Sequence, residues 1–178
     1  MKPASTRSQP SFSRSRDAGT RRLRAFVAVL LSAVAAPAAA AVSCSLSAPA
    51  MAFGPYDVFA GTAITSSSTI SVTCTLTGNV TTTVNGSLAL STGASGTYVQ
   101  RTMKSGANSL GYNLYTSAAL TTVWGNGTGG TQVISGSLTL TSASRVQTVT
   151  VDVFGSVPAL QDAKVGVYAD NVTMTVTY

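Results

Sequence analysis

The residue types that most often carry out chemistry in proteins are scarce in this sequence. It contains no histidine, two cysteines and five acidic residues in 178 positions. Without histidine there can be no Ser-His-Asp or Cys-His arrangement for nucleophilic catalysis, and no imidazole to hold a metal ion. The sequence therefore predicts a protein that is not an enzyme, with no metal site and no cofactor.

Four aspartates are the remaining set that could catalyse a reaction. A pair of carboxyl groups can hydrolyse a glycosidic bond, so a secreted hydrolase that depends on Asp152 is kept as a third hypothesis. Asp57, Asp162 and Asp170 lie beside turn or strand-end signals, where aspartate is common for conformational reasons. The glycine-rich stretch GNGTGG (125–130) lacks the Gly-Lys-Ser/Thr of a phosphate-binding loop and is interpreted as an ordinary loop.

The first 41 residues have the composition of a secretory signal peptide. Residues 1–24 are rich in lysine and arginine, residues 25–36 (AFVAVLLSAVAA) are apolar, and a run of small residues ends at Ala41. The apolar stretch is too short to span a bilayer, which takes about 20 residues. We expect cleavage near Ala41, a domain of residues 42–178, and export to the periplasm and then the cell surface.

The two cysteines, Cys44 and Cys74, both lie in the expected domain. An even number of cysteines in an exported chain predicts a disulfide bond. The alternative is a lipoprotein acylated on Cys44, but Ala41 stands where a lipobox favours leucine, and Cys74 would be left unpaired. The disulfide is the favoured interpretation.

The expected domain has no net charge. Residues 42–178 carry four basic residues and four aspartates, so the formal charge of +6 belongs to the signal peptide. A neutral domain has no basic surface for phosphate contacts, so nucleic acid is not expected as a partner. No apolar run in the domain is long enough for a transmembrane anchor.

Short alternating stretches dominate the domain and predict an all-β protein. The alternation places Ile70, Val72, Cys74 and Leu76 on one face of a strand, and Gly86 in the next strand suggests a bulge. Further alternating stretches are SLGYNLYTS (109–117), VISGSLTL (133–140), VQTVTVDVFG (146–155) and NVTMTVTY (171–178). Turn signals separate them, which is typical of an antiparallel β-sandwich.

An ordered set of local motifs resembles the spore coat protein U domain family, which is shared with pilins of archaic chaperone–usher pili. The matching segments are FGPYDV (53–58), ISVTC (70–74), LALSTG (88–93), YVQRTM (98–103), LGYNLYT (110–116), VWGNGTGG (123–130) and VFGSVPALQDAKVGVYADNVTMTVTY (153–178). The resemblance implies an immunoglobulin-like sandwich that lacks one strand. It also implies three kinds of partner: a periplasmic chaperone, an outer-membrane usher and neighbouring pilus subunits that lend the missing strand.

The C-terminal alternation agrees with this expectation. An exposed strand edge beside an apolar cleft must be covered by a partner to avoid aggregation. We therefore expect Val172, Met174, Val176 and Tyr178 to line a groove for a partner strand, although each could equally be ordinary core. Few residues lie between the expected cleavage site and Cys44, so the chain is expected to accept a strand without donating one.

Two functions from different classes follow. The leading hypothesis is an exported structural subunit of a surface fibre or coat, assembled by donor-strand complementation. The alternative is a tip adhesin or carbohydrate-binding module, in which Tyr98, Trp124 and Asn126 would contact the ligand because they are expected to be exposed in a loop cluster. For Trp124, a place in the core is the competing interpretation.

Overall fold

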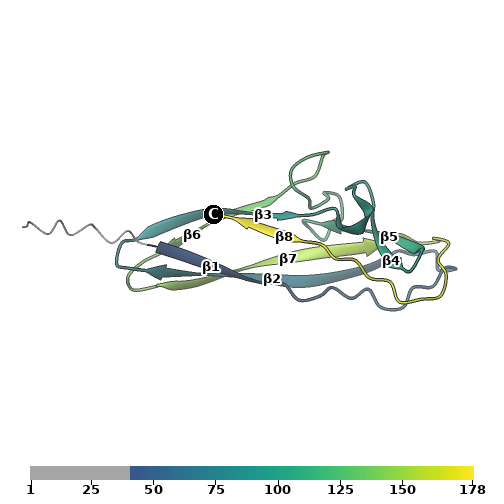
Figure 1. The fold of residues 1–178 in the computed structure, drawn as a ribbon, viewed down its shortest axis with the longest axis horizontal. Helices are drawn as coiled ribbons and strands as arrows, with labels where there is room; N and C mark the ends of the chain where they lie inside the picture. Colours follow the sequence, from purple (N-terminus) through teal and green to yellow (C-terminus); the bar gives the residue numbers. More distant parts are fainter. Residues whose placement is uncertain (1–40) are drawn as a thin grey trace, which may run out of the picture. The chain divides into compact units, whose positions relative to one another are not determined.

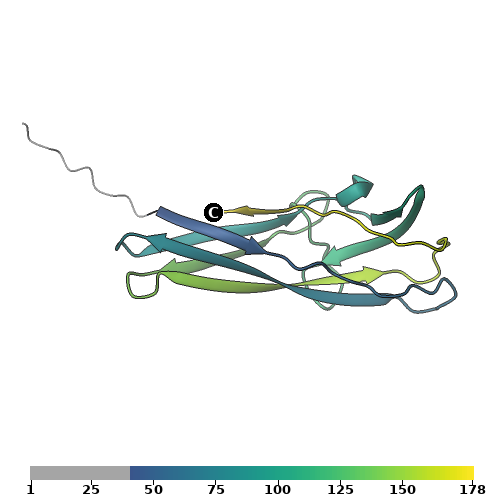
Figure 2. The same ribbon diagram turned by 60° about the horizontal axis from the view of Figure 1, so that its bottom comes forward.

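The computed structural model describes residues 41–178; the predicted signal peptide therefore lies almost entirely outside the described residues. Two antiparallel sheets form a sandwich (Figures 1 and 2). The five-stranded sheet has the order β1-β2-β7-β5-β4, and the three-stranded sheet has the order β6-β3-β8. The strands are β1 (Ala41–Ser47), β2 (Ile64–Thr77), β3 (Thr82–Leu90), β4 (Arg101–Ser105), β5 (Asn108–Tyr115), β6 (Ile134–Leu140), β7 (Val146–Val157) and β8 (Met174–Thr177).

The alternation seen in the sequence produces the core between the sheets. Ile70, Cys74 and Leu76 of β2 are buried, as are Leu88 and Leu90 of β3. Apolar residues that recur every second position place one face of each strand against the opposite sheet. The predicted immunoglobulin-like sandwich is therefore confirmed.

The disulfide joins the first two strands. Cys44 lies directly opposite Cys74 in the β1–β2 ladder, and their sulfur atoms are bonded. Cys74 is buried with Leu76 and Leu140 in a small cluster at this end of the sandwich. The predicted Cys44–Cys74 bond is confirmed in the structure, and it ties β1 to the centre of its sheet.

Two local expectations are wrong. Gly86 does not form a bulge, because the β3–β6 ladder runs one to one and places Gly86 opposite Gly136. The C-terminal strand is also shorter than the alternation over 171–178 suggested, since only Met174–Thr177 pairs regularly with β3. Before this strand, Ala169 forms an isolated bridge to Lys104 of β4.

Within residues 41–178, no helix has the length and apolar character that a membrane crossing requires.

Candidate functional site: an open groove between the sheets

The C-terminal segment has one unpaired backbone edge. One residue beyond the last pair of the β3–β8 ladder, Leu90–Met174, the Ser91 N–H donates to the Thr173 carbonyl over 2.9 Å and continues the same register. A bond between directly opposed residues marks a hydrogen-bonded pair, and such pairs recur every second residue. The main-chain groups of Val172, Met174 and Val176 therefore point away from β3. Among residues 41–178, no strand pairs with that edge of β8.

The segment that follows β1 forms the opposite wall. It is held on β2 by side-chain bonds, because Ser66 Oγ donates to the Ala52 carbonyl over 2.8 Å and Ser68 Oγ donates to the Pro49 carbonyl over 3.4 Å. A Cβ atom at Gly155 would meet the side chains of Met51 and Phe53. The glycine therefore leaves the space in which these two side chains lie against β7.

Between these walls lies a cavity that we call the acceptor groove. Its volume is about 540 Å³, and its floor consists of core side chains that include Ile70, Leu90 and Leu114. Val172 and Met174, two of the predicted groove residues, line this cavity. An apolar channel bounded by a free strand edge offers main-chain hydrogen bonds and side-chain pockets to an extended segment.

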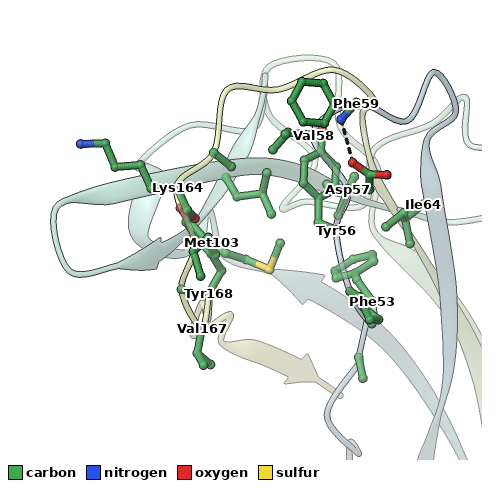
Figure 3. Close-up of a pocket in the computed structure, with 18 of the residues that line it drawn as sticks. Phe53, Tyr56, Asp57, Val58, Phe59, Ile64, Met103, Lys164, Val167 and Tyr168 are labelled. Atoms are coloured by element: carbon green, nitrogen blue, oxygen red, sulfur yellow. Dashed lines mark hydrogen bonds between the residues drawn. The ribbon is translucent and has the colours of Figure 1, made fainter.

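The acceptor groove adjoins a second cavity, which we call the end chamber (Figure 3). It has a volume of about 750 Å³ and shares Met51, Phe53, Met103 and Tyr168 with the acceptor groove. Figure 3 shows the 53–59 segment on one side and the 164–168 segment on the other, with Met103 between them. The two cavities therefore lie next to each other along the C-terminal segment.

Large apolar side chains around the end chamber are open to solvent. Phe59 is 88 % exposed, Val167 is 89 % exposed, and Val165 is fully exposed. Single exposed apolar residues are ordinary, but a group of them beside an apolar cavity indicates a surface that a partner covers.

The other two predicted groove residues lie near the disulfide. Val176 and Tyr178 line a smaller hollow of about 140 Å³, together with Cys44 and Cys74. The Tyr178 hydroxyl accepts a hydrogen bond from the Cys44 N–H over 3.3 Å, and Tyr178 is 57 % exposed. All four predicted residues therefore line cavities, but they do so in two separate hollows.

Asp170 fixes the wall of the acceptor groove. Its carboxylate accepts hydrogen bonds from the Tyr112 hydroxyl over 2.7 Å and from the Ala94 N–H over 2.9 Å. Gly93, at φ 63°, leaves room for this carboxylate. Any side chain at position 93 would occupy the space in which the carboxylate lies. Burial, together with the bond to Asp170, raises the pKa of Tyr112 above its ordinary value. The sequence alone indicates only a turn residue at Asp170.

Trp124 is not exposed, so the expectation that it contacts a ligand is wrong. Its exposed fraction is 0 %, and its indole N–H donates to the Leu88 carbonyl over 2.9 Å. Tyr98 is half-buried, and its hydroxyl donates to the Leu90 carbonyl over 2.8 Å. Asn126 is exposed, but its side-chain oxygen accepts bonds from the N–H and hydroxyl of Thr128. The three residues thus stabilise loops and do not form one site.

Arg101 is the residue that sequence reasoning missed in this region. Its guanidinium is fully buried and donates four hydrogen bonds, two to the Ser91 carbonyl and one each to the Trp124 carbonyl and Asn113 Oδ1. It also lies 5.2 Å from the centre of the Tyr98 ring. Burial lowers the pKa of Arg101 from its ordinary value. The guanidinium joins three parts of the chain behind the groove floor.

Among the described residues there is no cluster of three or more histidine, cysteine, aspartate or glutamate side chains that could hold a metal ion.

The fold and the groove define an all-β, disulfide-bonded sandwich whose β8 edge is open beside an apolar cavity. The spore coat protein U domain matches residues 30–175, and the chain belongs to this family. The match begins at residue 30, inside the segment predicted as a signal peptide. No curated protein matches the sequence.

Among solved structures, the chain is similar to one in the crystal structure of the CsuC–CsuE chaperone–tip adhesion subunit pre-assembly complex, from the archaic chaperone–usher Csu pili of Acinetobacter baumannii. The sequence identity is 19 % and the TM-score is 0.49. The alignment covers 78 % of this chain and 40 % of that chain, so this chain spans less than half of its length.

Proposed function

We propose that this chain is an exported, non-enzymatic structural subunit of a surface pilus or coat, and that it accepts a strand from a partner. The observation that carries the proposal is the acceptor groove, which joins a free edge of β8 to an open apolar core. A partner segment that pairs with Val172, Met174 and Val176 would cover both at once. Membership of the spore coat protein U domain family supports the same assignment.

The partners that we propose are a periplasmic chaperone, an outer-membrane usher and neighbouring subunits of the same fibre. A chaperone strand would occupy the acceptor groove during transit, and a strand of another subunit would replace it at the surface. β-strand addition of this kind draws affinity from main-chain hydrogen bonds and specificity from alternate side chains.

The strand near the N-terminus supports an accepting role. Residues Ala41–Ser47 pair along their whole length with β2, and the Cys44–Cys74 bond holds them there. A strand that is fixed in its own sheet cannot enter the groove of another subunit. Any donor segment of this chain would have to lie before residue 41, and N-terminal sequencing of the exported protein would show how much of that region remains.

Co-expression tests the proposal. The chain is expressed in the periplasm alone or together with a chaperone of the archaic chaperone–usher class. We expect a soluble 1:1 complex with the chaperone and mostly aggregated chain without it, because the apolar groove is then uncovered. A chain that is soluble, monomeric and cooperatively folded without any partner would contradict strand complementation.

The alternative of a carbohydrate-binding module loses its main support, because Trp124 is buried and cannot stack on a sugar. We therefore do not propose Tyr98, Trp124 and Asn126 as a binding site.

A further inference from the structure

A further free strand edge lies on the side of β7 that faces away from β2. β5 pairs with β7 only at Phe154, Gly155 and Ser156. Among residues 41–178, no strand pairs with this side of β7 from Val146 to Val153. This edge is distinct from β8 and from the acceptor groove, and we call it the β7 edge.

The β2–β7 ladder shows which main-chain groups face outward. One residue beyond its last pair, Thr75–Val146, the Leu76 N–H donates to the Arg145 carbonyl over 2.8 Å and continues the same register. Because hydrogen-bonded pairs recur every second residue, the odd-numbered residues of β7 point their main-chain groups toward β2. The N–H and C=O groups of Val146, Thr148, Thr150 and Asp152 therefore point into the β7 edge.

Most of the usual devices that protect a strand edge are missing here, and Asp152, whose carboxylate accepts a hydrogen bond from the Thr69 hydroxyl over 2.7 Å, is the one charged residue of the stretch. Residues 146–153 (VQTVTVDV) contain no lysine, arginine, proline or glycine, and the ladder to β2 has no bulge. Natural edge strands are commonly protected by charge, proline, bulges or a covering loop. An unprotected, regular and largely uncharged edge is a template for another strand.

Apolar side chains beside the edge are also left uncovered. Val149 faces the interior of the sandwich, yet it is 41 % exposed and lines the hollow near the disulfide. A Cβ atom placed at Gly136 of β6 would meet nothing within 4 Å, so this side of the hollow is open. A strand added at the β7 edge would widen the sheet, and its inward-facing side chains would lie beside Val149 and reduce its exposure.

We propose that the β7 edge pairs with the same edge of a second copy of this chain. In an antiparallel pair centred on Val149, Val146 lies opposite Asp152 and Thr148 lies opposite Thr150 of the other copy. All four outward residues of each copy then form hydrogen-bonded pairs, and each pair exchanges two N–H···O bonds. The contact is self-complementary, as a two-fold dimer requires.

Side chains and charge agree with this pairing. At the centre of the pair, threonine meets threonine on the outer face and Val149 meets its own symmetry mate on the inner face. Toward the ends Val146 lies opposite Asp152 and Gln147 opposite Val151, so the match is confined to the central residues. The four basic and four acidic residues of the described domain cancel, so two copies have no net charge to keep them apart. β5 blocks the edge beyond Val153 and so limits the overlap to this stretch.

The experiment counts copies of this chain per particle by native mass spectrometry. The oxidised protein is purified from the periplasm with any bound strand donor left in place, so that the acceptor groove does not cause the association. At high micromolar concentration, where small interfaces are populated, we expect two copies per particle. Thr150→Pro removes an outward N–H without touching the β2 ladder and should give one copy, whereas Thr150→Val keeps that N–H and should give two.

A charge pair tests the register without relying on proline. T148K/T150K places lysines directly opposite each other across the two-fold axis and should give one copy per particle. T148K/T150E places lysine opposite glutamate and should restore two copies, in a salt-dependent way. A single copy in the wild-type protein, or two copies in every variant, would overturn the proposal. Neither result depends on whether the acceptor groove binds a strand.

Discussion

Arg101 illustrates how one buried charge can organise several parts of a chain. Its guanidinium donates to carbonyl oxygens of Ser91, Trp124 and Asn113, which are well separated in the sequence. Arginine suits this position because its planar fork presents donors in several directions, which a lysine ammonium cannot reproduce in the same geometry. The segments that it joins flank or belong to the strands that form the groove floor.

We expect Arg101→Met to lower the free energy of unfolding by about 3 kcal/mol or more. The substitution leaves the carbonyl oxygens of Ser91 and Trp124 without donors and removes one of the two bonds to Asn113 Oδ1, and each unsatisfied acceptor costs about 1–3 kcal/mol. Lys104→Met on the same strand is the matched control, because Lys104 is exposed and should change stability by less than about 0.5 kcal/mol. Urea unfolding of the strand-complemented protein measures both. Equal effects of the two substitutions would show that the Arg101 bonds are dispensable.

At the scale of the strand, the alternation in the sequence was a good guide to which face is buried. The alternate apolar residues of 70–76 and 110–114 pack in the core as expected. Only one orientation of such a strand buries its apolar face, so the alternation predicts which face is inside. β4 could not be predicted in this way. Its stretch RTMKS has one apolar residue, and its burial depends on Arg101, whose hydrogen-bond partners lie far away in the sequence.

The same limit applies to Gly86 and Trp124. A glycine within a strand suggests a bulge. Here Gly86 lies opposite another glycine, Gly136 of β6, so neither strand has a side chain at this pair, and the ladder is regular. For Trp124 the sequence favours a place in the core and leaves a ligand contact as the alternative, and in the structure the carbonyl of Leu88 accepts its N–H inside the core. Which residues the fold brings opposite each other is tertiary information that local patterns do not contain.

β8 provides the sharpest test of the groove, because its two faces differ. Met174 points into the acceptor groove, whereas Thr175 is exposed on the opposite face of the strand. We expect Met174→Lys to weaken binding of a partner strand by at least about 100-fold, since the bound strand would bury an unpaired ammonium group. Thr175→Lys should bind normally.

Two assays compare the variants. A peptide of the chaperone strand competes for the groove, and a pull-down from the periplasm measures how much complex each variant forms. If Met174→Lys and Thr175→Lys recover the same amount of complex, the partner strand does not lie against Met174. The proposed place of the groove would then be wrong, even if a complex forms elsewhere on the molecule.

For the whole molecule, the disulfide is the main constraint outside the core. Cys44 and Cys74 are 30 residues apart in the sequence, and their bond holds β1 against β2. Closing a loop of this size stabilises a protein by about 3–4 kcal/mol in the chain-entropy model. We therefore expect C44S/C74S to lower the free energy of unfolding by a similar amount.

Urea unfolding of the strand-complemented protein with and without reductant measures this effect. The wild-type protein should lose stability when it is reduced, whereas C44S/C74S should be insensitive to reductant. A wild-type protein that unfolds at the same urea concentration in both conditions would show that the β1–β2 ladder is sufficient without the covalent bond.

The floor of the acceptor groove consists of the same side chains that hold the two sheets together. A molecule that binds there therefore stabilises the whole domain and raises its melting temperature. When its concentration is 100 times its dissociation constant, the free energy of unfolding increases by about 2.7 kcal/mol. A thermal-shift screen of candidate peptides can therefore find the natural occupant through its effect on melting alone. The stability that the domain gains at a known peptide concentration is thus a direct measure of the affinity of that peptide.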